Sequence, residues 1–222
     1  MGSCQGMTTE IVVVGAGGHA KVCIELLVAM GESVAFCVGG ADAAGVCVGV
    51  PILAGDSHLE RLRGEGYSRV FIAIGNNRLR ERLAADAIAM GYELVSAVSP
   101  HAVISKSARI GAGVAVMAGC VINAEAEVCD LAIINTGATI DHDCRIGIAA
   151  HIAPQSALAG NVGVGRASFL GIGCKVIPER TIGQRVIIGA GSVVISDIGD
   201  DVTAVGVPAR VITESHRNGT SS

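Results

Sequence analysis

The sequence predicts two connected units, a small α/β domain followed by a parallel β-helix of six-residue repeats. The strongest observation lies in the second half, where every sixth residue is Val, Ile or Leu through seventeen consecutive positions from Val98 to Val194. The first half lacks this period and alternates short apolar runs with helical patterns. These observations place an α/β domain at 1–97, the β-helix at 98–200 and a C-terminal cap and tail at 201–222.

The first domain is expected to be a small, Rossmann-like open sheet in which strands alternate with helices. Ile11–Val14 is entirely apolar, as expected of a parallel strand buried on both faces. Ser57 and Glu60 match a capping box at the start of a short helix. In chain order, strands are expected at 11–14, 34–38, 70–74 and 94–97. Helices are expected at 20–30, at 57–64 and from the loop at 75–78 to residue 90.

The loops that follow the first three strands are expected to form one crevice, because ligands of open α/β sheets bind beyond the carboxyl ends of the strands. Gly17 and Gly18 would let a phosphate or a sugar approach main-chain N–H groups at a helix start. A glycine-rich turn can equally reflect tight packing alone. His19 favours a binding role, since packing explains an imidazole in such a turn poorly.

A period of six fits neither an α-helix nor an ordinary strand, but it fits a three-sided coil of about 18 residues with a turn every six. The aliphatic residue fills the interior, and small residues such as Cys120 and Cys144 lie four places further on, in a crowded position. Glycine directly after the aliphatic residue, as at Gly147 and Gly165, is expected to ease the turn. The absence of Trp agrees with so narrow an interior.

The segment 135–143 is the most polar stretch inside the repeat. His142 and Asp143 fall outside the interior positions, and an imidazole beside a carboxylate suits proton transfer near neutral pH. Asp141 is an alternative partner, and a polar surface turn is the alternative to a catalytic role. Gly160 lies one coil above His142, at about 4.8 Å, where its N–H could meet an oxyanion.

Composition excludes several classes of function. The net charge is −4 and no cluster of Lys or Arg occurs, which argues against nucleic acid or an anionic membrane as partner. No uncharged run reaches 18 residues, so no transmembrane helix is expected, and the N-terminus lacks the pattern of a secretory signal. The eight cysteines form no C-x-x-C pair and are expected to be reduced thiols in the cytoplasm. The sequence contains no close pair of histidines, so no metal site is expected.

Five motifs together resemble a known family: GAGGHAK, FIAIGNNRLRERL, NTGATIDHDC, HIAP and GVPAR. The family is that of the bacterial sugar acetyltransferases related to the sialic-acid O-acetyltransferase, and the resemblance is greatest to the N-acetyltransferases of nucleotide-linked 4-amino-4,6-dideoxy sugars. It extends over about 11–211. It implies a left-handed β-helix, a homotrimer with active sites at the subunit interfaces, acetyl-CoA along an outer groove and the nucleotide-linked amino sugar in the α/β crevice.

The resemblance also implies a role for individual residues. His142 is similar to the general base, Asp143 to its acidic partner, Asn135 to a contact near the reacting amine, and Gly160 to the donor for the thioester oxygen. Further residues resemble ligand contacts: His151, Ile172 and Ala190 for acetyl-CoA, and Gly17, Gly18, His19 and Gly75 for the nucleotide sugar.

The end of the second strand departs from the family pattern. Relatives that bind UDP-linked sugars carry acidic residues there, whereas this chain has Val38-Gly39-Gly40. A purine base is therefore favoured, and GDP-perosamine is the expected acceptor over a UDP-linked sugar. Two other functions stay open from the sequence: O-acetylation of a sugar hydroxyl, and a non-catalytic hexapeptide scaffold.

Overall fold

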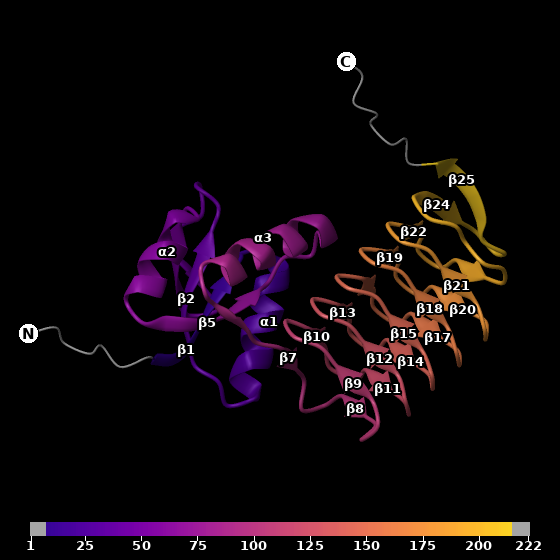
Figure 1. Ribbon diagram of the computed structural model, residues 1–222, viewed down its shortest axis with the longest axis horizontal. Helices are drawn as coiled ribbons and strands as arrows, with labels where there is room; N and C mark the ends of the chain where they lie inside the picture. The colour runs from indigo at the N-terminus through magenta and orange to yellow at the C-terminus, as the bar shows by residue number, and fades with distance from the viewer. Residues whose placement is uncertain (1–7, 215–222) are drawn as a thin grey trace, which may run out of the picture.

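The computed structural model describes residues 8–214 and shows the two units side by side (Figure 1). The α/β domain lies against the first coils of a triangular prism, and the prism extends away from it toward the C-terminal hairpin. The fold is thus an α/β domain joined to a parallel β-helix. Within the described residues no helix is long and apolar enough to cross a membrane.

The α/β domain is built on a six-stranded sheet in the order β3-β4-β2-β1-β5-β6. All neighbours pair in parallel except β3, which is antiparallel to β4. Its strands are β1 (Thr8–Val14), β2 (Val34–Gly39), β3 (Val46–Cys47), β4 (Val50–Ala54), β5 (Tyr67–Ile72) and β6 (Glu93–Leu94), and its helices are α1 (Gly18–Ala29), α2 (Ser57–Gly64) and α3 (Asn77–Ala89). The central strand β1 is buried on both faces from Ile11 onward, as its apolar run predicts.

Several local expectations for this domain are corrected. The antiparallel β3–β4 pair was not among the expected strands, and β4 contains Pro51, a residue that is disfavoured inside a sheet. The strand expected at 70–74 begins earlier and ends at Ile72. The capping-box expectation for α2 is wrong: its N-cap is Asp56, and no side chain caps the helix.

The prism contains seventeen two-residue strands in three parallel sheets, one for each face. The first face holds β7 (Ala97–Val98), β10 (Ala115–Val116), β13 (Ile133–Ile134), β16 (His151–Ile152), β19 (Phe169–Leu170) and β22 (Ile187–Ile188). The second face holds β8 (Val103–Ile104), β11 (Val121–Ile122), β14 (Thr139–Ile140), β17 (Ala157–Leu158), β20 (Lys175–Val176) and β23 (Val193–Val194). The third face holds β9 (Arg109–Ile110), β12 (Glu127–Val128), β15 (Arg145–Ile146), β18 (Gly163–Val164) and β21 (Thr181–Ile182).

Coils pair with a register of 18 residues, as Ile134 with Ile152 shows. The second residue of nearly every strand points inward, and from Val116 to Val194 these residues are at most 3% exposed. Each such aliphatic side chain contributes about 1.5–3 kcal/mol by leaving water. The hairpin of β24 (Val202–Val205) and β25 (Arg210–Glu214) extends the first face at its far end.

The turns of the prism correct the role expected for glycine. Left-handed backbone occurs every six residues from Gly113 to Gly191, but three places after the aliphatic residue rather than directly after it. The glycines directly after the aliphatic residue serve close packing of coils. A Cβ on Gly147 would lie 2.8 Å from the Arg166 nitrogen, so only glycine lets the next coil approach.

The α/β domain covers part of the first face, and we call the surface between them the seam. Ala115 and Ile133 point outward from the prism yet are 1% exposed, because the domain packs over them. Further along the same face, Ile187 is exposed. The seam therefore ends partway along the prism, and the far part of the first face stays exposed beside the crevice loops.

Candidate active site

His142 lies on the turn between the second and third faces, which we call the His142 edge. Its side chain is 60% exposed, and Nδ1 lies 2.7 Å from Oδ2 of Asp143, itself 58% exposed. Asp143 adopts a φ of 58°, a left-handed conformation that Asp tolerates better than most residues. The turn thereby folds the carboxylate onto the imidazole, so Asp143, and not Asp141, is the side-chain partner of His142.

Asp141 has a different role at the same turn. Its Oδ1 accepts a hydrogen bond from the main-chain N–H of His142 at 2.8 Å and another from Asn123 Nδ2 at 2.9 Å. These two bonds hold the pKa of Asp141 below its ordinary value, with Asn123 the larger cause. Asp141 thus fixes the backbone of His142, while Asp143 fixes its ring.

The hydrogen bond with Asp143 is the main cause that raises the pKa of His142 above its ordinary value of 6.5, and the charges of Asp141 and Asp143 add to it. With Nδ1 bonded to the carboxylate, the neutral ring carries its hydrogen on Nδ1 and leaves Nε2 free to accept a proton. The edge therefore presents an exposed base of fixed tautomer.

Gly160 lies on the next coil, directly against the His142 ring. A Cβ at this position would come within 2.5 Å of Cε1 and Nε2, so any larger residue would displace the imidazole. The Gly160 carbonyl accepts from Glu179, but within residues 8–214 its N–H has no hydrogen-bond acceptor. The His142 ring and the free N–H of Gly160 thus lie together on one edge, and their catalytic roles stay predictions.

The seam holds a second group of site residues. His151 is 8% exposed, and its Nε2 lies 3.1 Å from Nδ2 of Asn135. Asn135 Oδ1 accepts from the Thr136 N–H at 2.8 Å, so the amide nitrogen faces His151 and donates to it. The neutral imidazole then carries its hydrogen on Nδ1, a buried atom that makes no hydrogen bond of good geometry within the described chain, while the nearby Gly75 backbone partly offsets the lowering of the ring's pKa. Such a donor can serve a ligand that enters the seam.

Positive charge and burial keep the seam imidazoles neutral. The pKa of His151 is lowered to about 4 by burial first and then by Arg80 and His19. The pKa of His19 is also lowered to about 4, by burial and by Arg80. His19 Nε2 lies 3.5 Å from Cys23 Sγ within α1. The crevice and the first face of the prism therefore meet in one electrostatic environment.

The glycines predicted for the crevice are open to solvent. Gly17 is the N-cap of α1 and Gly18 its first residue, and a Cβ on either would meet nothing within 4 Å. Gly75 follows β5 and is equally open. A pocket of about 510 Å³ begins at Gly75 and continues along the first face, and it is lined by Gly75, Asn76, Asn77, Arg78, Ala167, Phe169, Arg185 and Ile187. Most of these residues were missed, since only the fold brings 75–78 beside 167–187.

Ile172 and Ala190 occupy the turn between the first and second faces. They are one coil apart, since Gly191 donates to the Ile172 carbonyl at 2.7 Å. Ile172 is 57% exposed and Ala190 is exposed as well. His151, predicted with them as an acetyl-CoA contact, lies instead within the seam, so its role stays a prediction.

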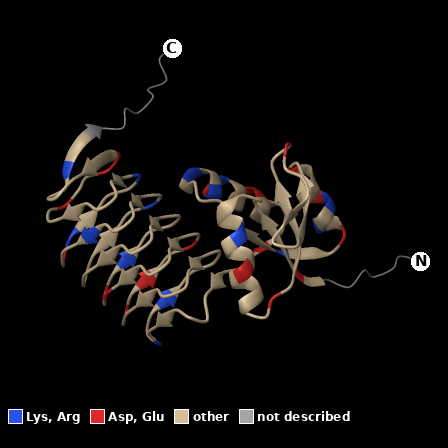
Figure 2. Ribbon diagram, turned by 180° about the vertical axis from the view of Figure 1, so that it is seen from behind, with Lys and Arg blue, Asp and Glu red and all other residues tan. Residues whose placement is uncertain are grey.

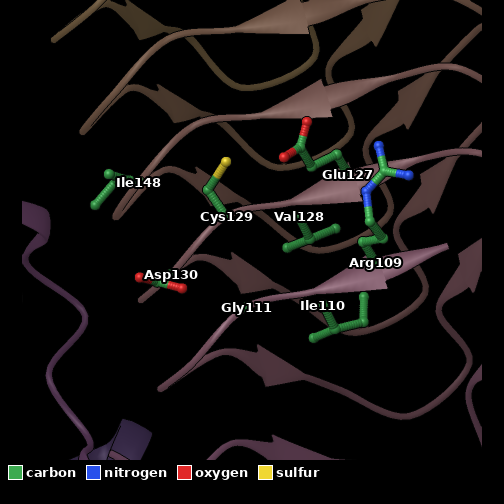
Figure 3. A pocket seen from close by; sticks show the side chains of 8 residues that line it. All are labelled: Arg109, Ile110, Gly111, Glu127, Val128, Cys129, Asp130 and Ile148. Carbon is green, nitrogen blue, oxygen red and sulfur yellow. The ribbon is translucent and has the colours of Figure 1, made fainter.

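A hollow on the third face belongs to neither group. Figure 3 shows it lined by Arg109, Glu127, Cys129, Asp130 and their neighbours. Basic and acidic residues alternate on neighbouring strands of the prism (Figure 2). Beside the hollow, Arg145 Nε lies 3.7 Å from Glu127, and Arg109 Nη1 lies 3.8 Å from Glu125. Burial raises the pKa of the Cys129 thiol, which argues against a reactive thiolate. No group of three or more His, Cys, Asp or Glu placed to hold a metal occurs in the described chain.

Known proteins resemble both units of this chain. Residues 10–87 match the model described as the PglD N-terminal domain. PerB from Caulobacter crescentus, solved with CoA and GDP-perosamine, is 54% identical, with 92% of this chain and 97% of that chain covered and a TM-score of 0.89. A variant of that perosamine N-acetyltransferase with a histidine replaced by asparagine was solved with the same ligands and is 53% identical over 92% and 97% of the two chains, with a TM-score of 0.90.

A second relative extends the comparison beyond that enzyme. The acetyltransferase domain of PglB from Neisseria gonorrhoeae FA1090, in complex with acetyl coenzyme A, is 37% identical over 92% of this chain and 100% of that chain, with a TM-score of 0.86. These matches identify the prism as the left-handed β-helix of a hexapeptide-repeat acetyltransferase. The chain belongs to the family of nucleotide-sugar N-acetyltransferases, because the similarity covers both of its units.

Proposed function

We propose that this enzyme transfers the acetyl group of acetyl-CoA to the 4-amino group of GDP-perosamine. The observation that carries the proposal is the 54% identity, over 97% of its length, to an enzyme solved with CoA and GDP-perosamine. The second strand supports the choice of base, since β2 ends at Gly39 without the acidic residue expected for a UDP-linked sugar.

The chemistry follows from the His142 edge. The amine attacks the thioester carbonyl and forms the C–N bond, while Nε2 of His142 accepts the proton from the nitrogen. Asp143 stabilises the resulting imidazolium through Nδ1. The N–H of Gly160 donates to the oxyanion. The intermediate then collapses as the C–S bond breaks, and the imidazolium returns its proton to the departing thiolate.

We further propose that the active site is completed between subunits of a homotrimer. In a triangular prism the His142 edge lies opposite the first face, so His142 cannot meet a sugar held in the crevice of its own chain. On the same edge, further coils expose Ile177 and Ile195 by 39% and 44%, as an apolar contact requires. A neighbour would bring its crevice, Asn135 and the exposed Ile172 and Ala190 to this edge, with acetyl-CoA between the prisms.

The test measures thiol release from acetyl-CoA with GDP-perosamine, UDP-linked and dTDP-linked 4-amino sugars, and a hydroxyl sugar acceptor. We expect the highest kcat/KM with GDP-perosamine, an N-acetyl product by mass spectrometry and a trimeric mass by light scattering. Turnover of the hydroxyl acceptor alone would replace the proposal by O-acetylation. Monomers that are fully active at all concentrations would contradict the shared site.

A further inference from the structure

Arg80 is a buried charge at the seam that the proposed chemistry does not use. It lies in α3, is 1% exposed and ranks first among the fully buried side chains by volume. No carboxylate among the described residues forms an ion pair with it. Burial lowers the pKa of Arg80 to about 10, yet the guanidinium stays charged at neutral pH. A buried charge without an ion-pair partner calls for an explanation beyond stability, since an apolar side chain could fill the space as well.

One side of the guanidinium holds the third loop of the crevice. Nη1 donates to the carbonyls of Ile74 and Gly75 at 2.9 and 3.2 Å. Nη2 donates to Oδ1 of Asn77 at 2.9 Å. The loop that these bonds fix contains Gly75, a predicted contact of the nucleotide sugar, and its backbone lies close enough to His151 to influence the pKa of that imidazole.

The other side of the guanidinium holds the prism. Nε donates to the Leu131 carbonyl at 2.8 Å and Nη2 to the Ala149 carbonyl at 2.8 Å. Leu131 and Ala149 are equivalent left-handed turn residues on successive coils. All five N–H donors of Arg80 are therefore used, and they join the loop to two coils at once.

Asn77 continues the same contact to a third coil. Its Nδ2 donates to the carbonyls of Ala167 and Ser168 at 3.0 and 3.1 Å. Ala167 repeats the left-handed turn of Leu131 and Ala149 one coil further on. The first turn of α3 thus docks on a ladder of turn carbonyls, and this ladder sets the distance between crevice and prism.

We propose that Arg80 is a positioning residue for the acceptor: it fixes the Gly75 loop to the coils at Leu131 and Ala149, so that a sugar in the crevice is held at a set place relative to the prism. The inference rests on the proposed function for the identity of the acceptor. The planar guanidinium is needed because a lysine ammonium has three donors and cannot reproduce the five-way fork.

The kinetic test compares Arg80→Lys with Arg82→Lys, since Arg82 is an exposed arginine on the same helix whose guanidinium makes no hydrogen bond or ion pair with the described residues. We expect Arg80→Lys to lower kcat/KM for the nucleotide sugar by about 10²-fold, the order of loss caused by a 1 Å misplacement. The KM for acetyl-CoA should stay near the wild-type value, and added methylguanidinium should restore part of the activity of Arg80→Ala. Equal kcat/KM for the two lysine variants, or an equal loss for both substrates, would overturn the inference.

Hydrogen exchange of the full-length protein tests the anchoring without turnover. The amides of 74–77 should exchange faster in Arg80→Lys than in Arg82→Lys, while those of the distant coils stay unchanged. Unchanged exchange at 74–77 would overturn the inference even if the enzyme is active. Faster exchange together with a wild-type protein that acetylates no nucleotide sugar would overturn the proposed function alone.

Discussion

The exposed His142 edge and the buried seam place imidazoles in opposite electrostatic environments. At the edge, Asp143 raises the pKa of His142, whereas in the seam burial and the Arg80 charge lower the pKa of His19 and His151 to about 4. One ring is therefore suited to accept a proton, and the other two are suited to donate hydrogen bonds while uncharged. A residue type alone does not reveal this difference, because the same side chain is suited to accept a proton in one place and to donate a hydrogen bond while neutral in the other.

The largest expected effect comes from removing the imidazole of His142, the proposed base of the exposed edge. His142→Ala should lower kcat by about 10²–10⁴-fold, the usual contribution of a general base, with little change in acetyl-CoA affinity. The measurement is steady-state thiol release together with calorimetric binding of acetyl-CoA. His101→Ala, an exposed histidine on the prism, is the control and should keep normal kcat. An unchanged kcat in His142→Ala would remove this residue from the role.

A smaller loss should follow when the ring is displaced but kept. Gly160→Ala places a Cβ only 2.5 Å from Nε2 of His142, so the ring must move, and kcat should fall by about 10²-fold. Gly163→Ala is the matched control, because its nearest neighbour would be 3.9 Å away. A crystal structure of Gly160→Ala should show the imidazole turned away. Normal rates in Gly160→Ala would mean that the position of the ring is not critical.

Asp143→Asn should change the pKa of His142 while leaving the position of the ring nearly unchanged. Asn tolerates the left-handed turn, so the backbone is kept while the carboxylate is lost. The base must be neutral, and therefore kcat/KM rises with pH through the pKa of His142. Without Asp143 that pKa falls, so the acid limb of the profile should move to lower pH and the maximal rate should drop roughly tenfold.

The dependence of kcat/KM on pH also distinguishes the carboxylates of Asp141 and Asp143. Asp141→Asn keeps an oxygen that can accept from the His142 N–H and should shift the acid limb less than Asp143→Asn. A larger shift in Asp141→Asn would reverse the assignment of the partner.

The last expected effect concerns stability and comes from the seam. Because the folded pKa of His19 and His151 is about 4, below the ordinary 6.5, the unfolded chain binds more protons between these values. The free energy of unfolding should therefore fall as the pH drops from 6.5 to 4. Melting temperatures across this window measure it, and His151→Gln should flatten part of the dependence. A pH-independent melting temperature in the wild type would contradict the neutral seam.

The prism could be predicted almost residue by residue, because each inward position repeats one steric requirement. That a carboxylate lies beside His142 was also predictable, since Asp141 and Asp143 share its turn, but only the structure showed that Asp143 is the side-chain partner. The corrections concern features that local signals do not reveal or indicate wrongly, as the capping-box pattern at Ser57 and Glu60 did. The role of Gly147 depends on a backbone one coil away, and β4 carries Pro51, which disfavours a strand when read alone.

The sequence by itself determined the period, the interior of the prism and the polar residues of its exposed edge, because these depend on residues within one turn or at a fixed repeat. Only the tertiary structure decided how the α/β domain docks, and with it the roles of Arg80, Asn77 and the buried His151. Those contacts join residues 50 to 90 positions apart, as from Arg80 to Leu131 and from Asn77 to Ala167. Their energy depends on desolvation and hydrogen-bond geometry at a surface that exists only after both units have folded.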